Sequence, residues 1–234
     1  MEREPGCGYA CQWFDVARLA ALALDRFMLR LHDNATSGNA YKVRLLLTQL
    51  GRAFERIEYD TDRGATRTPE FLRTKNANGR IPVLELEDGR CLPESNAILW
   101  YLAEGTRLMP NASTDQERWQ RAEVLQWMFF EQYSHEPNIA TVRAWITHHV
   151  DMTVERQAAL PGKRKQGVAA LEVMERHLTT WRFFVGDRYT ISDIALYAYA
   201  HVAHEGGFDL SPFGAVRAWL GRVAAEPGHL AMTA

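Results

Sequence analysis

From residue 29 onward, the hydrophobic pattern of the chain switches between the two-residue period of strands and the 3.6-residue period of helices. The expected elements are a strand over Leu29–His32, an amphipathic helix over Asn39–Leu50 that ends at Gly51, a strand over Phe54–Tyr59 and a short helix that begins at Thr68 and stops before Asn76. This alternation predicts a sheet with helices packed on it.

A hairpin is predicted next. Val83–Leu86 and Arg90–Leu92 alternate well enough to be short strands, and Asp88–Gly89 supplies the positive φ angles of a tight turn. Pro82 lacks an N–H and therefore belongs at the entry of a strand. A cis bond before Pro82 would turn the N–H and C=O of Ile81 outward, toward an extended ligand backbone, whereas an ordinary trans proline is the common alternative.

The hairpin leads into an apolar run at Ala97–Ala103, with Ser95 where a helix N-cap should lie. The first N–H groups of that helix would attract a carboxylate, and Glu94 could receive an ammonium group on the same ligand. Carboxylate and ammonium together describe the α-amino acid end of a small peptide. The structural alternative is that Ser95 only caps its helix and Glu94 is a solvated acid.

The second half of the chain has a different character. Residues 107–115 are polar and are predicted to be a linker, after which residues 116–234 show only helical periodicity. Thr190 and Asp193 form a capping pair, which predicts a buried helix start and not a chemical site. We therefore expect a sheet domain over residues 28–106 and an all-helical domain over residues 116–234.

Composition narrows the function. The chain has 234 residues, of which 47% are hydrophobic and 24% charged, and its net charge is −2. No basic stripe with interleaved aromatics favours nucleic acid, and no apolar run near 18 residues favours a membrane span. The three cysteines, Cys7, Cys11 and Cys91, are too scattered for a disulfide framework, so a reducing compartment is expected, and no metal-binding set is predicted.

Three blocks of sequence point to a family. Arg80-Ile-Pro-Val followed by Pro93-Glu-Ser-Asn-Ala-Ile resembles the glutathione site of the glutathione S-transferases. Ser37–Leu47 and Tyr189–Leu196 agree with the family in order and spacing. The resemblance covers about residue 28 to the end and implies a thioredoxin-like βαβαββα domain followed by an all-α domain. Residues 1–27 have no counterpart, and we interpret them as an extension or a misassigned start.

The resemblance also implies how glutathione would bind, as a cosubstrate. Arg80 would meet its glycine carboxylate, with Lys75 as the alternative. Ile81 and Pro82 would hold the cysteinyl backbone, and Glu94 with Ser95 would hold the γ-glutamyl end.

The chemistry requires a thiolate. A free thiol with a pKa of about 8.5 is only about 3% ionised at pH 7, and lowering that pKa by two units needs about 2.7 kcal/mol of stabilisation. Hydrogen-bond donors and a helix N-terminus can supply it. Ser37 and Asn39 lie at such a helix start, although Ser-Gly-Asn is also an ordinary cap. In the family this slot holds tyrosine, serine or cysteine; here it holds Ser37, and Tyr41 is expected to be a packing residue.

Phe130, Tyr133 and Trp145 are candidates for a second-substrate pocket, although most aromatics at helical spacing are core residues. We expect a cytoplasmic transferase that conjugates glutathione to small apolar electrophiles. A glutathione-dependent disulfide reductase or peroxidase stays open, because Ser-Gly-Asn is similar to the bacterial Nu class, and so does a noncatalytic glutathione-binding member. The resemblance also implies a homodimer.

Overall fold

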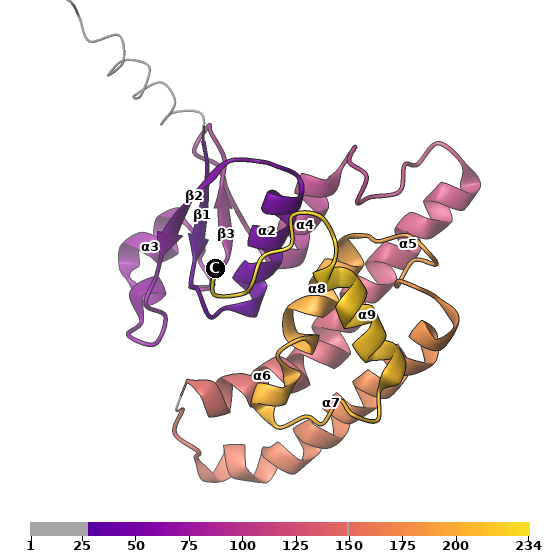
Figure 1. The fold of residues 1–234 in the computed structure, drawn as a ribbon. Helices are drawn as coiled ribbons and strands as arrows, with labels where there is room; N and C mark the ends of the chain where they lie inside the picture. Colours follow the sequence, from indigo (N-terminus) through magenta and orange to yellow (C-terminus); the bar gives the residue numbers. More distant parts are fainter. Residues whose placement is uncertain (1–27, 149) are drawn as a thin grey trace, which may run out of the picture.

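The computed structural model describes residues 28–148 and 150–234, and the predicted extension 1–27 lies outside these residues. The first half contains β1 (Leu29–Asp33), α2 (Gly38–Gln49), β2 (Phe54–Glu58), the 3-10 turn η1 (Ala65–Arg67), α3 (Pro69–Thr74), β3 (Val83–Glu85), β4 (Cys91–Pro93) and α4 (Ser95–Ala103). This order confirms the predicted βαβαββα arrangement (Figure 1).

The four strands form one mixed sheet in the order β2-β1-β3-β4. Strand β1 is parallel to β2 and antiparallel to β3, and β3 is antiparallel to β4. In the hairpin between β3 and β4, Gly89 takes the positive φ of 83°, whereas the prediction gave a positive φ to Asp88 as well. Helix α3 covers one face of the sheet, and α2 and α4 cover the other (Figure 1).

The second half is helical, as predicted. Its elements are α5 (Asp115–Phe130), the π-helical turn η2 (Glu131–His135), α6 (Glu136–Thr147), α7 (Val154–Thr180), α8 (Ile191–Ala200), η3 (Ala203–Gly206) and α9 (Gly214–Ala224). Helix α5 begins with a capping box between Thr114 and Glu117. Across the described part of the chain, the helices are too short or too polar to cross a bilayer.

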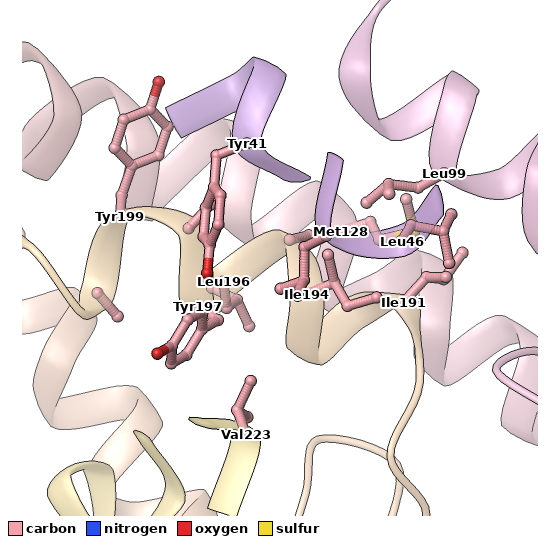
Figure 2. Close-up of a cluster of buried hydrophobic side chains, with 14 of the residues drawn as sticks. Tyr41, Leu46, Leu99, Met128, Ile191, Ile194, Leu196, Tyr197, Tyr199 and Val223 are labelled. Carbon is pink, nitrogen blue, oxygen red and sulfur yellow. The ribbon is translucent and has the colours of Figure 1, made fainter. Parts of the chain in front are cut away.

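Helix α8 is the shared core of the two halves. Its apolar side chains face α2 and α4 of the first half as well as α5 and α9 of the second (Figure 2). The labelled members of this cluster are Tyr41, Leu46, Leu99, Met128, Ile191, Ile194, Leu196, Tyr197, Tyr199 and Val223. Because this one helix packs against both halves, it holds the two halves together.

The predicted capping pair starts helix α8. The Asp193 carboxylate accepts the backbone N–H of Thr190 at 2.9 Å, the backbone N–H of Phe184 at 3.1 Å and the indole N–H of Trp219 at 2.9 Å. Burial nevertheless raises the pKa of Asp193 to about 7. The pair therefore anchors the helix in the core, as the sequence predicts.

The segment after α9 returns to the first half and ends beside the sheet (Figure 1, yellow). The Tyr41 hydroxyl donates to the carbonyl of Leu230 at 2.8 Å, and Arg44 donates to the carbonyl of Met232 at 2.5 Å. Arg44 also bonds the buried Asp33 carboxylate at 3.1 Å. This segment is a second connection between the two halves, in addition to α8.

Candidate active site

Ser37 is the N-cap of α2. Its hydroxyl oxygen accepts the backbone N–H of Ala40 at 3.2 Å, so the hydroxyl hydrogen stays available to a ligand. The next residue is Gly38. A Cβ at this position would lie 2.4 Å from the Tyr199 ring, so the position requires glycine. The close approach of Tyr199 thus explains the glycine between the two predicted catalytic residues.

Asn39 is oriented away from Ser37, toward the helical half. Its side-chain nitrogen donates to Glu136 Oε1 at 2.7 Å, and its oxygen accepts the Ser95 hydroxyl at 3.2 Å. The structure thus places Asn39 beside the predicted γ-glutamyl contacts, while Ser37 borders another cavity. Its predicted role as a thiolate donor stays a prediction.

The loop before β3 carries the predicted peptide contacts. The bond between Ile81 and Pro82 is cis. Two side-chain hydrogen bonds hold the backbone of this loop. Asn76 donates to the carbonyl of Arg80 at 2.9 Å, and Thr66 donates to the carbonyl of Gly79 at 2.9 Å. The alternative cation, Lys75, is bonded to Glu85 at 2.5 Å.

Glu94 has a φ of 70° and is the only non-glycine residue with positive φ among those that the structure describes. Such strain is typical of functional sites, because surrounding contacts must hold it in place. Glu94 occupies the N-cap position, and α4 begins at Ser95, so the expectation that Ser95 is the N-cap is corrected by one residue. The Ser95 side chain is instead free to bond Asn39, and Lys42 Nζ lies 3.5 Å from its hydroxyl.

Two cavities meet at Arg80 and Ile81. The smaller has a volume of about 50 Å³ and is lined by Asn39, Asn76, Arg80, Ile81, Pro82, Glu94, Ser95, Gln132 and Glu136. The larger has a volume of about 360 Å³, and its walls include Thr36, Ser37, Arg67, Arg80, Ile81, Ala140, Arg143, Ala144, His148 and Tyr199. The predicted sulfur contact Ser37 and the predicted γ-glutamyl contacts therefore line different cavities, which share Ile81.

Two side chains that line the larger cavity, Arg143 and His148, lie beside carboxylates. Arg143 donates to Glu205 at 2.6 Å and to the backbone carbonyl of Thr36 at 3.1 Å, which links α6 to the loop before Ser37. His148 lies 3.2 Å from Asp62. These pairs brace the walls of the cavity.

The three predicted second-substrate residues are not brought to this cavity. Phe130 and Tyr133 border a separate groove beside α7, with Tyr133 87% exposed, and Trp145 packs under Lys163, whose Nζ lies 5.9 Å from the ring centre. Residues two apart on a helix do not share a face. Arg143 faces the larger cavity, so Trp145 lies on another side of α6. The apolar part of the wall comes instead from Ala140 and Ala144.

Sequence reasoning missed Tyr199, Glu136 and the buried pair of Lys42 with Glu131. Burial raises the pKa of Tyr199 well above its usual value, so its hydroxyl keeps its proton. One signal was available, since Lys42 and Arg44 are charged residues inside a largely apolar stretch of α2, which is unusual unless the charges are paired. The positions of Glu136 and Tyr199 had no such signal.

Comparison with known proteins identifies the family. The profile of the glutathione S-transferase N-terminal domain matches residues 28–104, and that of the C-terminal domain matches residues 157–222. The chain belongs to the glutathione S-transferase family. A solved glutathione S-transferase from Pseudomonas fluorescens is 46% identical, with a TM-score of 0.82 over 88% of this chain and 100% of that one.

Relatives in this family have different named activities. Maleylacetoacetate isomerase of Rhizobium meliloti is 32% identical over 77% of this chain and 84% of its own. Disulfide-bond oxidoreductase YfcG of Escherichia coli is 28% identical over 82% and 89%. The transferase URE2P6 of Phanerochaete chrysosporium, solved with oxidized glutathione, is 25% identical with a TM-score of 0.75 over 86% and 93%. The named activities thus differ between relatives, and one structural neighbour is solved with oxidized glutathione bound.

Proposed function

We propose that this protein binds glutathione across the two cavities and activates it as a thiolate. The observation that carries the proposal is the meeting of the cavities at Ile81, with Ser37 on one side and Glu94 with Ser95 on the other. An extended peptide spans about 3.3–3.6 Å per residue, so a tripeptide on Ile81 would reach from one cavity into the other. Its γ-glutamyl end then lies at Ser95, and its glycine carboxylate lies within reach of Arg80.

The sulfur would lie at the start of α2. The Ser37 hydroxyl and the first N–H groups of the helix favour negative charge there, which supports ionisation of the thiol. Asn39 stays a candidate second donor. In conjugation, the thiol proton leaves to solvent, the sulfur lone pair forms a bond to an electrophilic carbon, and the leaving group departs with its electron pair.

The electrophile would enter the larger cavity. Ala140 and Ala144 provide an apolar strip beside Ser37, which fits a small apolar electrophile. We place the reaction in the cytoplasm, where glutathione is kept reduced.

A second candidate function is glutathione-dependent disulfide reduction. The Escherichia coli relative is named a disulfide-bond oxidoreductase, and the Phanerochaete chrysosporium structure holds oxidized glutathione. In this reaction the thiolate attacks a disulfide sulfur, forms a mixed disulfide and releases one thiolate. A second glutathione then resolves the mixed disulfide. The same Ser37 site would serve both reactions.

We also propose that the protein is a homodimer. A groove of about 550 Å³ lies between α4 and α5, and its lining is mainly apolar: Ala97, Trp100, Leu125, Met128 and Phe129, with Asn96 and Gln132 at its edge. Phe129 is 69% exposed and Tyr101 on α4 is 50% exposed. Exposed apolar surface of this kind is typical of interfaces.

The deciding experiment is calorimetric titration with glutathione, followed by assays of the same sample with an aryl halide and with a small disulfide. Binding with conjugation supports the transferase. Binding with faster disulfide reduction supports the second candidate. An absence of binding would contradict both enzyme proposals, because each depends on the glutathione site.

Ser37 gives the first specific prediction. Ser37→Ala should raise the pH midpoint of bound-thiolate absorbance in the ultraviolet by about one unit, because it removes one neutral hydrogen bond to sulfur worth about 1–1.5 kcal/mol. Ser37→Thr keeps both the hydroxyl and the N-cap and should restore the midpoint. An unchanged midpoint in Ser37→Ala would remove Ser37 from the proposed chemistry.

A further inference from the structure

A buried ion pair joins the two halves behind the smaller cavity. Lys42 on α2 and Glu131 on η2 are both 0% exposed, and Lys42 Nζ lies 2.9 Å from Glu131 Oε1. Asn96 and Gln132 donate to the other oxygen of Glu131 at 3.0 and 2.9 Å. A buried pair is costly to desolvate and is a weak source of stability, so its place beside a ligand cavity calls for another explanation.

The pair is connected to Glu136, which lines the cavity. Lys42 Nζ lies 3.7 Å from Glu136 Oε2, and Gln132 donates to that oxygen at 2.5 Å. Asn39 donates to Glu136 Oε1 at 2.7 Å. These contacts come from both halves of the protein and fix the orientation of the Glu136 carboxylate. Each carboxylate oxygen has two acceptor positions, so both oxygens keep room for a further donor, and the side chain is 22% exposed.

The charges around the smaller cavity favour a cation at its inner end. Lys42 is shared between Glu131 and Glu136 and balances only one of these two carboxylates, and Glu94 adds a further negative charge to the lining. The cation of the lining, Arg80, belongs to the loop beside Ile81. The cavity volume of about 50 Å³ suits one small polar group. An ammonium donates up to three hydrogen bonds and matches two carboxylates.

We propose that Glu136 is a second receiver, with Glu94, of the α-ammonium group of the γ-glutamyl end of glutathione, and that Lys42 and Glu131 position it. The inference rests on the proposed glutathione site and adds to it a residue of the helical half, Glu136, which lines the smaller cavity. Glu136 belongs to the helical half. This half therefore contacts the α-ammonium group of the peptide, while the sheet half binds the peptide backbone.

The test compares two ligands by calorimetry. One is glutathione, and the other is glutaryl-cysteinylglycine, in which a hydrogen replaces the α-amino group. Glu136→Gln should weaken glutathione binding at least tenfold, because a charge-assisted hydrogen bond is lost, and should change binding of the glutaryl analogue less than twofold. Glu87→Gln, which removes a carboxylate from the exposed hairpin, is the matched control and should leave both affinities unchanged.

The outcomes separate this inference from the function on which it rests. If the wild-type protein fails to bind glutathione, the proposed function is wrong. If the wild type binds glutathione and Glu136→Gln binds it equally well, or loses both ligands to the same extent, the role of Glu136 in reading the ammonium is wrong. The midpoint of bound-thiolate absorbance should shift less in Glu136→Gln than in Ser37→Ala, because Ser37 is unchanged and the new amide oxygen can still accept the hydrogen bond of Asn39.

Discussion

At the scale of single residues, the structure depends on charges that are buried in pairs. Lys42 and Asp33 are fully buried, and each has a partner of opposite charge: Glu131 for Lys42 and Arg44 for Asp33. Such pairs add little net stability while both members are present, but removal of one member leaves an uncompensated charge in the interior.

Lys42→Met should therefore lower the free energy of unfolding by about 3 to 5 kcal/mol, because Glu131 would stay buried without its cation. Urea denaturation followed by tryptophan fluorescence measures the loss. The double variant Lys42→Met with Glu131→Gln removes both charges and should recover at least half of it. A loss below about 1 kcal/mol in the single variant would show that Glu131 finds another counter-charge or becomes protonated.

The sequence predicted those site residues that lie in contiguous motifs. Ile81, Pro82, Glu94 and Ser95 come from such motifs and border one cavity, and their contacts with glutathione stay a prediction. Glu136 is 97 residues from its partner Asn39, and no local pattern connects them. Phe130, Tyr133 and Trp145 lie outside the larger cavity, a placement that the sequence could not predict because composition cannot tell which face of a helix borders a cavity. Their role with a second substrate stays a prediction.

At the scale of elements, strand and helix positions agreed with the sequence within about two residues where caps and turns mark them. The break between α5 and α6 was not predicted. Here the chain forms the π-helical turn η2, and π-helical turns occur often at functional sites. The turn carries Glu131 toward Lys42 and places His135 in the interior, where both ring nitrogens lack a hydrogen-bond partner among the residues that the structure describes.

His135 makes the stability of this turn depend on pH. Burial, with a smaller contribution from the positive charge of Lys42 and against the charge of Glu136, lowers the pKa of His135 to about 3. The unfolded chain has an imidazole pKa of about 6.5 and therefore binds the proton first. The contribution of neutral His135 is present above about pH 6.5 and is lost as the pH falls toward 3.

His135→Leu should remove the part of the fall in unfolding free energy at low pH that comes from His135. Between pH 6.5 and 5, the free energy of unfolding of the wild type should fall by about 2 kcal/mol more than that of the variant, as urea denaturation at each pH would measure. Other buried groups with shifted pKa values are present in both proteins and cancel; they are His32, His177, His201, His229 and Asp193. Parallel pH curves for the two proteins would contradict the prediction.

At the scale of the whole molecule, the proposed dimer would bury the groove between α4 and α5. Phe129→Glu would place a charge in that interface and should convert the dimer to a monomer at micromolar concentration, because an unpaired charge is costly to bury. Sedimentation velocity measures the change. Trp181→Glu alters an aromatic residue that is 47% exposed at the end of α7 and should leave the dimer intact.

A monomeric wild type would contradict the dimer itself. A dimer that persists in Phe129→Glu would place the interface on another surface. The sequence could not locate this face, because exposed and buried apolar residues look alike until the helices are packed.

The segment that returns from α9 to the sheet also has a consequence for the order in which the chain is made. The hydroxyl of Tyr41 and the carbonyl of Leu230, which it bonds, are separated by 189 positions, and Arg44 reaches Met232 across 188. Domains generally fold in turn as they leave the ribosome, but contacts this distant are formed late. The sheet half therefore emerges with Arg44 already able to bond Asp33, but the bonds of Tyr41 and Arg44 to the returning segment form only after Leu230 and Met232 have been synthesised.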